Sequence, residues 1–232
     1  MNRAHRLKGV MGFTITEALV TVLVFSFFLA VMFMTISYGF RTFSVAVARS
    51  DVTTEARRLV LFLEDELRSS AYFSLSVESR VEDGQHRDGV CFVSLRDWSR
   101  DTSYDVIEDR PDWDRYIIYY ATGHPVTGKL VRMVVDPAPG EVGSFPYAPF
   151  SSNPATYMLD DPLEYPRNED VSNLRVLASK VKSFEVRLLP VSQEVEVTTL
   201  LRQNGIMSRR GDGAREGGTF ELHYRVNPQN TK

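Results

Sequence analysis

The stretch GFTITEALVTVLVFSFFLAVMFMTISYGF, residues 12–40, decides the fold of this chain. From Ala18 to Phe40 it contains no Asp, Glu, Lys, Arg, His or Pro, and as an α-helix these residues would extend about 35 Å. A helix of that length can cross a bilayer. A secretory signal peptide has a shorter apolar region followed by a small-residue cleavage site, whereas here a helical pattern continues after Phe40. We therefore predict a membrane-spanning helix that stays in the mature protein.

Glu17 stands at the start of this apolar run. A carboxylate in a membrane helix costs free energy and usually has a partner or a purpose. In one interpretation Glu17 marks the membrane interface, beside the unpaired amides of a helix N-terminus. In the other it meets a cation within the membrane, which a cut after Gly12 would create as the new α-amine of Phe13.

The motif Gly12-Phe13-Thr14-x-x-Glu17, with a basic leader before it and an apolar helix after it, resembles the type III signal sequence of type IV pilins and type II secretion pseudopilins. In that family a prepilin peptidase cuts between the glycine and the phenylalanine, and the new amine is N-methylated. The resemblance implies that residues 1–12 are a leader, and that Phe13 becomes the methylated first residue. It also implies that Glu17 pairs with the N-terminal amine of a neighbouring subunit during assembly.

The composition fits one anchor followed by one globular domain. Lys and Arg (27) do not exceed Asp and Glu (30), and the net charge is −3, so no nucleic-acid partner is predicted. The single cysteine, Cys91, excludes an internal disulfide. Because Cys91 lies in an apolar run, we expect a small buried core residue, not a nucleophile.

Residues 41–75 change from apolar to amphipathic, and we predict that the helix of residues 13–40 continues to about Tyr72. Apolar residues recur at intervals of three or four: Val52, Ala56, Leu59, Leu63, Leu67 and Ala71. The charged residues between them are predicted to form one solvated face: Glu55, Arg57, Arg58, Glu64, Asp65, Glu66 and Arg68. The apolar stripe needs a sheet to cover it.

Residues 76–232 are predicted to form a β-rich domain. Short apolar runs and period-two alternation indicate antiparallel strands near residues 90–93, 116–120, 130–135, 184–188, 195–197 and 220–226. Of the alternating strands, one face should cover the helix and the other should meet solvent or a neighbouring subunit. The loop of residues 136–173 holds seven of the eleven prolines, which excludes a long regular element. It is either a subunit-contact surface or a variable insertion.

No enzymatic constellation is found in the sequence. The four histidines are scattered, no pair has metal-ligand spacing, and no cofactor or metal site is predicted. The acidic residues of segments 109–114 and 160–161 could ligate Ca²⁺, but without ordered ligand spacing a solvated acidic loop is favoured. The chain is therefore predicted not to be an enzyme.

The order of the segments extends the resemblance to larger minor subunits, namely J-type pseudopilins and W-type minor pilins. It rests on the YYATG…GKLVRMV hairpin, LASKVKSFEVRLL and the closing GTFELHYRV. This implies an α+β fold, in which a long N-terminal helix packs on an antiparallel sheet.

The implied function is that of a structural subunit, assembled at or near the tip of a type II secretion pseudopilus or a type IV pilus. The implied partners are the prepilin peptidase, other minor pilins or pseudopilins, the inner-membrane assembly platform and membrane lipid. The implied location is the inner membrane, with the N-terminus cytoplasmic and the domain periplasmic. The alternative is a single-pass anchored periplasmic binding or sensor domain, which would usually follow a flexible linker.

Overall fold

The computed structural model describes residues 14–95, 104–105, 110–111, 113–123, 128–135, 154–160, 174–202 and 219–229. The fold is α+β, as the sequence predicts. The chain divides into two compact units, Met1–Val47 and Ala48–Lys232. Gly12 and Phe13 lie outside the described residues.

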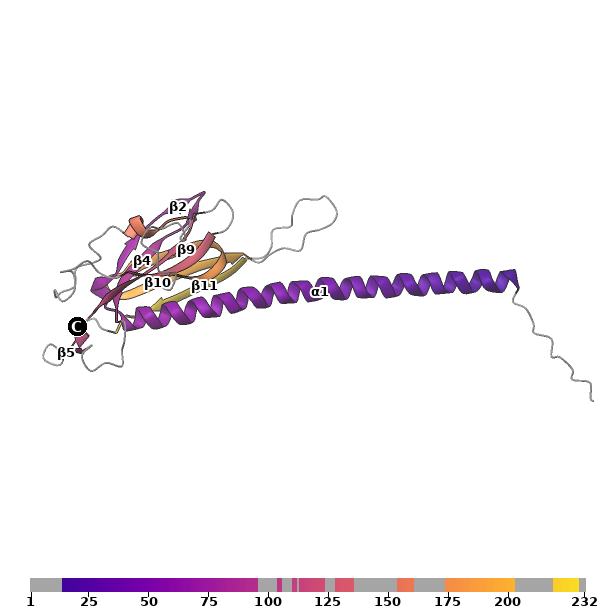
Figure 1. Cartoon of the computed structure of the whole chain (residues 1–232), viewed down its shortest axis with the longest axis horizontal. Coiled ribbons are helices and arrows are strands. Elements are labelled where there is room, and N and C mark those ends of the chain that lie inside the picture. The colour runs from indigo at the N-terminus through magenta and orange to yellow at the C-terminus, as the bar shows by residue number, and fades with distance from the viewer. Residues whose placement is uncertain are drawn as a thin grey trace, which may run out of the picture. The chain divides into compact units, whose positions relative to one another are not determined.

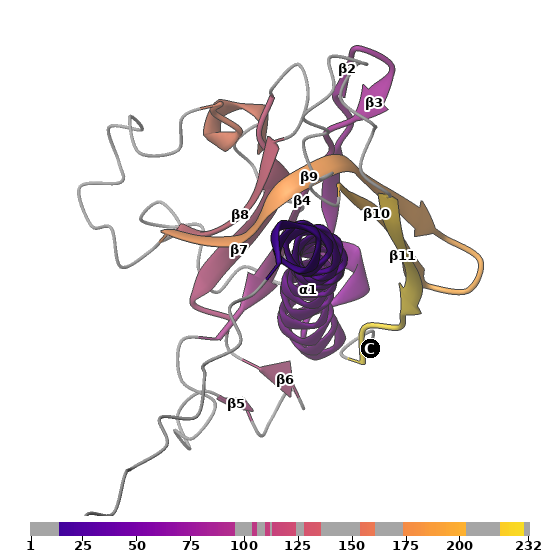
Figure 2. The same cartoon turned by 90° about the vertical axis from the view of Figure 1, so that its right-hand side faces the viewer.

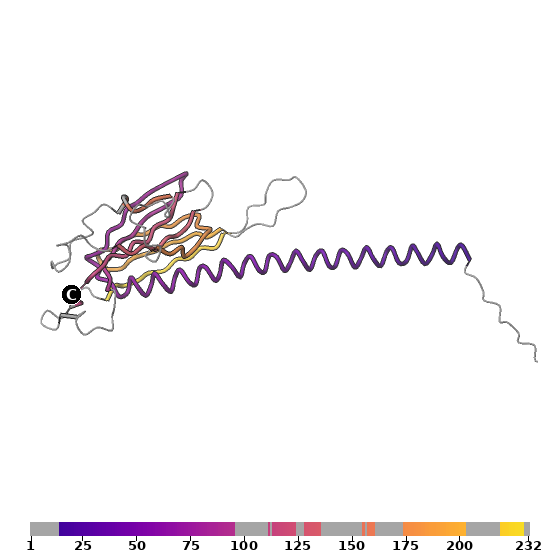
Figure 3. The backbone as a smooth tube through the Cα atoms, in the orientation of Figure 1, coloured from indigo at the N-terminus to yellow at the C-terminus, as the bar shows by residue number. Residues whose placement is uncertain are grey.

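The helix α1, Ile15–Ser69, is 55 residues long and contributes to both units (Figures 1 and 3). It contains no proline, and Gly39 is its only glycine, so nothing in its interior breaks the hydrogen-bond ladder. Every described residue of the first unit is exposed. In the second unit the predicted stripe is buried: Val52, Ala56, Leu59, Leu63 and Leu67.

The helix ends at Ser69, three residues before the predicted end. The Ser70 hydroxyl donates to the carbonyl of Leu67 (2.7 Å), and the amide of Gln229 donates to the carbonyl of Arg68 (2.9 Å). Because these carbonyls of the last turn are satisfied from outside the helical ladder, the helix can stop there. The 3₁₀ turn η1, Tyr72–Ser74, follows.

A seven-stranded antiparallel sheet has the order β1-β4-β7-β8-β9-β10-β11. Its strands are β1 Ser76–Glu78, β4 Gly89–Ser94, β7 Arg115–Ala121, β8 Gly128–Val135, β9 Leu174–Leu189, β10 Glu194–Arg202 and β11 Thr219–Val226. All six predicted strands are confirmed within it. Two small hairpins and a 3₁₀ turn were not predicted: β2 Val81–Glu82 with β3 Gln85–His86, β5 Tyr104–Asp105 with β6 Arg110–Pro111, and η3 Pro154–Tyr157.

The strand β9 is shared between two halves of the sheet. Its first half pairs with β8 up to Val181, and its second half pairs with β10 from Val181 to Leu189. Both pairings contain register shifts, which bend and twist a sheet. The sheet therefore curls, with β9 lying between the β4–β7–β8 half and the β10–β11 half (Figure 2). The core inside the curl contains the buried stripe of α1 and residues of both halves.

A second core lies on the other face of β4, β7 and β8, and the strands β4 and β7 are almost wholly buried. In β10, buried residues alternate with half-buried ones, as expected for a strand with one buried face. The strands β4 and β7 do not follow this pattern, because both of their faces are buried. Tyr157 and Met158, from the proline-rich region, are buried in the second core. A Cβ at Gly89 would lie 2.5 Å from the sulfur of Met158, so the Met158 side chain packs directly against the glycine. Two residues of the proline-rich region thus belong to the core, whereas Ala155 and Asp160 of the same region are exposed.

Arg87 and Asp88 are buried charged residues beside β9. The carboxylate of Asp88 accepts hydrogen bonds from the Ser79 hydroxyl (3.1 Å), the Arg80 amide (3.2 Å) and the Val186 amide of β9 (3.0 Å). A buried carboxylate is tolerated when its oxygens are satisfied in this way. Burial lowers the pKa of Arg87, although nearby carboxylates oppose the shift.

Candidate functional site

Helix α1 begins with a capping box formed by Thr14 and Glu17. The Glu17 Oε2 atom accepts hydrogen bonds from the Thr14 amide (3.0 Å) and the Thr14 hydroxyl (2.8 Å). In return, the Glu17 amide donates to the Thr14 hydroxyl oxygen (3.3 Å). This reciprocal bonding satisfies amides that the helix itself leaves unpaired. The Glu17 carboxylate is therefore oriented by its own chain.

The capping box fits the interpretation of Glu17 as a residue of the helix N-terminus. The Thr-x-x-Glu spacing before an apolar run is the sequence signal for such a cap, and the sequence analysis did not use it. Gly12 and Phe13, the other predicted site residues, lie outside the described part of the chain. Whether Glu17 meets an α-amine therefore stays a prediction.

The first unit exposes a continuous apolar helix surface. Phe25, Phe27, Phe28 and Phe33 are all more than half exposed, and the helix is long and apolar enough to cross a membrane. Its threonine hydroxyls are satisfied within the helix. Thr21 donates to the carbonyl of Glu17, and Thr35 to that of Val31. Such hydroxyls can enter an apolar environment without an unpaired polar group.

In the second unit, a partly buried polar clamp fastens α1 to β7 and β8. Arg132 Nε and Nη2 donate to both oxygens of Glu66 at 2.6–3.0 Å, and the Tyr119 hydroxyl also donates to Glu66. Burial alone would lower the pKa of Arg132. The hydrogen bond with Glu66 and the negative charge of Glu66 outweigh this effect and raise the pKa. Burial and the charge of Glu66 raise the pKa of Tyr119. Glu66 was predicted on a solvated face, and this is wrong because its partner is a strand residue far along the chain.

Glu55 forms a second clamp on the same flank of α1. Its carboxylate accepts hydrogen bonds from the Ser179 amide (3.3 Å) and hydroxyl (2.9 Å), beside the half of β9 that pairs with β8. Between the two clamps, the Arg175 guanidinium lies 5.3 Å from the centre of the Phe62 ring. These hydrogen bonds are exposed to solvent, so Glu55 has a partner on β9 and still lies at the predicted solvated face. Arg57, Arg58, Asp65 and Arg68 remain exposed, as predicted.

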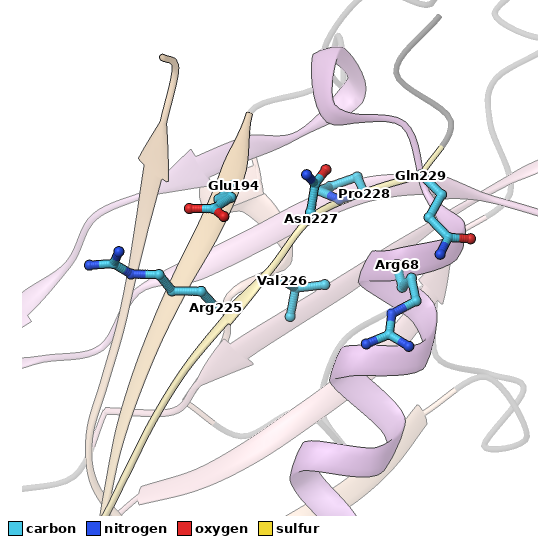
Figure 4. A pocket seen from close by; sticks show the side chains of 7 residues that line it. All are labelled: Arg68, Glu194, Arg225, Val226, Asn227, Pro228 and Gln229. Atoms are coloured by element: carbon cyan, nitrogen blue, oxygen red, sulfur yellow. The ribbon is translucent and has the colours of Figure 1, made fainter. Parts of the chain in front are cut away.

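An open hollow lies where the end of α1 meets β10, β11 and residues 227–229 (Figure 4). Two of its side chains are arginines, and each has an acidic partner outside the hollow's lining. Arg68 pairs with Glu64 (2.5 Å), and Arg225 pairs with Glu196 (2.8 Å). The positive charges are thus already compensated, and the hollow offers no convergent binding group.

The described residues offer no metal site, since no three His, Cys, Asp or Glu side chains gather among them. Asp160, one of the acids considered for Ca²⁺, accepts hydrogen bonds from Arg80 and from the Gly123 amide, both at 2.7 Å. Burial would raise the pKa of Asp160, but these bonds and the charge of Arg80 lower it. In segment 109–114, Asp109 and Asp112 lie outside the described residues, so the prediction for this acidic loop stays a prediction.

Cys91 is fully buried, as predicted, and burial raises the pKa of its thiol. A thiol in this state is a poor nucleophile. Comparison of the chain with protein-family models, with curated proteins and with solved structures found no match.

Proposed function

We propose that this chain is a minor subunit of the type IV pilin-like class, either a J-type pseudopilin of a type II secretion system or a W-type minor pilin. The observation that carries the proposal is the GFTITE motif, whose Thr14 and Glu17 cap the first turn of an exposed apolar helix. The subunit is made with residues 1–12 as a leader. A prepilin peptidase removes the leader, and Phe13 is N-methylated.

In the proposed role the apolar half of α1 has two successive environments. Lipid surrounds it in the inner membrane, with the N-terminus cytoplasmic, and helices of neighbouring subunits surround it in the filament. The exposure of every described residue up to Val47 is compatible with both environments. Internally bonded hydroxyls such as that of Thr35 let the helix move between them without a new desolvation cost.

Glu17 would set the axial register of the assembly. Thr14 engages Oε2, whereas no described residue donates to Oε1, which is left to accept the Phe13 amine of a neighbouring subunit. Desolvation offsets much of the Coulombic gain of an ion pair that is removed from water. The pair would therefore fix the axial position of neighbouring subunits more than it would stabilise the filament. The neighbours in the filament, the peptidase and the assembly platform are the proposed partners.

The continuity of α1 supports a subunit role over an anchored binding or sensor domain. The helix continues from its exposed apolar half into its packed half without a Pro-, Gly- or Ser-rich linker. A domain that works independently of its anchor would usually have such a linker.

The first test determines the mature N-terminus. The full chain is expressed with and without a prepilin peptidase, and its N-terminal peptide is identified by mass spectrometry. We expect methylated Phe13 only when the peptidase is present, and Gly12→Leu should block the cut. A chain that begins at Met1 in the presence of an active peptidase would overturn the proposal.

The second test separates assembly from helix capping. Glu17→Ala removes the carboxylate, whereas Thr14→Val removes the capping hydroxyl and keeps the carboxylate. Both proteins should remain in the membrane. We expect Glu17→Ala to abolish incorporation into sheared filaments and Thr14→Val to reduce it only in part, because capping alone is worth about 1 kcal/mol. Equal defects would mean that Glu17 acts only as a cap.

A further inference from the structure

The two flanks of α1 in the second unit are attached to the sheet by different chemistry. On the flank facing β7, β8 and the first half of β9, the clamps of Glu66 and Glu55 provide charge-assisted hydrogen bonds. Bidentate bonds of the Arg132–Glu66 kind are among the stronger ones in proteins, and Tyr119 adds a third donor. This flank resists separation through both apolar and polar contacts.

The flank facing β10 and β11 is attached mainly by apolar contacts, and a backbone hydrogen bond from the Gln229 amide, just after β11, to the Arg68 carbonyl (2.9 Å) closes its far end. No described side chain of β10 or β11 has a hydrogen bond or ion pair with a side chain of α1. Instead, two hydroxyl oxygens on these strands, Thr199 Oγ1 and Tyr224 Oη, are buried and have no hydrogen-bond partner among the described residues. Burial, and secondarily the charge of Glu64, raise the pKa of Tyr224. Each unpaired buried hydroxyl weakens the packing that hides it.

Burial on the helix side decreases only at β11. Ile117 and Tyr119 of β7 are fully buried there, and so are Val195 and Val197 of β10, whereas in β11 Leu222 and Tyr224 are half-buried and Phe220 is exposed. The second core covers the far face of β4, β7 and β8. The far face of β11 consists of exposed polar residues, including His223 and Arg225. The β10–β11 half therefore has less buried apolar surface holding it in place.

We propose that β10 and β11 form a leaf that separates from α1 by local opening while the β7–β8 half stays attached. The leaf stays joined to the rest of the sheet through the second half of β9, with which β10 pairs. There the Asp88 carboxylate holds the Val186 amide, and the Asp88 amide donates to the Phe184 carbonyl (3.0 Å). Opening exposes the helix-facing residues of β10, such as Val197, without breaking either clamp. The leaf is independent of the proposed subunit role.

Hydrogen exchange of the full chain in detergent micelles, read by mass spectrometry, tests the leaf. The comparison is between β10 and β7, because each lies between two paired strands and neither is a sheet edge. Local opening occurs at lower free energy than global unfolding and shows as lower protection. We expect β10 amides to exchange about tenfold or more faster than β7 amides, after correction for intrinsic rates. Equal protection of β10 and β7 would overturn the leaf.

Two near-isosteric variants test its cause. Thr199→Val and Tyr224→Phe each remove an unpaired buried hydroxyl, so each should slow exchange in β10 and β11 by about fivefold and leave β7 unchanged. Thr198→Val is the matched control, because its hydroxyl lies on the exposed face, 3.2 Å from His223 Nδ1, and this variant should not slow exchange. Faster exchange in the first two variants would show that their hydroxyls are bonded, and would overturn the proposed cause.

Discussion

Replacing Arg132 with Met should strongly destabilise the second unit. The change removes the bidentate partner of the Glu66 carboxylate, which joins α1 to the sheet. The side chains of Arg132 and Glu66 are only 15% and 18% exposed, so Glu66 would keep a nearly buried charge with the Tyr119 hydroxyl as its remaining donor among the described residues. Breaking one side of a buried pair costs about 3–5 kcal/mol. Since water still reaches part of this pair, we expect a loss of about 3 kcal/mol in the free energy of unfolding.

The assay is chemical denaturation of the full chain in mild detergent, followed by far-UV circular dichroism. Arg187→Met is the matched control, because Arg187 also pairs with a glutamate, Glu185, but is 64% exposed. Exposed pairs contribute little, so this control should change stability by about 0.5 kcal/mol or less. The same loss in both variants would refute the idea that the clamp fastens α1.

A double variant isolates the penalty of the unpaired charge. Glu66→Leu with Arg132→Met replaces both charges with apolar groups of similar size, and buried pairs replaced in this way are often close to neutral. We expect the double variant to recover most of the stability lost in Arg132→Met. A double variant less stable than Arg132→Met would refute the reasoning.

Three further predictions concern the second unit. Gly128→Ala should cost about 2 kcal/mol or more in the same denaturation assay, because the added Cβ would overlap the carbonyl oxygen of Thr122. Cys91 should resist thiol reagents in the folded protein and react after unfolding, since burial raises its pKa; rapid labelling of the folded chain would contradict this. Above about pH 10 the free energy of unfolding should fall, because the pKa values of Tyr119 and Tyr224 are raised in the folded state and the unfolded chain releases these protons first. The fall should approach about 1.4 kcal/mol per pH unit for each tyrosine, and denaturation of Tyr224→Phe across this range should show a shallower fall.

The elements that sequence reasoning found are those governed by local patterns. The helix from Ile15 needed only a long apolar run, and its packed half needed only the spacing of Leu59, Leu63 and Leu67. Alternation located β10 and β11, and the apolar run around Cys91 located β4. Such patterns report which face of an element is buried, but they do not name the partner.

The residues that sequence reasoning misplaced depend on distant partners. Glu66 is charged and lies beside the apolar stripe, so the sequence predicts a solvated residue, but the sheet brings Arg132 to it. Met158 lies in a proline-rich region that predicts loop, yet it fills space left by a glycine of β4. The Thr14–Glu17 cap was within reach of local reasoning, because its spacing is itself a known helix-start signal.

The core inside the curl contains residues from both ends of the second unit's sequence, Val52 near its beginning and Val226 near its end. A chain that emerges N-terminus first therefore carries its apolar helical stripe uncovered until β9, β10 and β11 follow. Contacts between distant parts of a chain form slowly, and exposed apolar surface invites aggregation during the delay. A chain truncated before Val226 would still lack part of its core. Folding of this unit is thus tied to completion of the whole chain, and its early segments need protection until then.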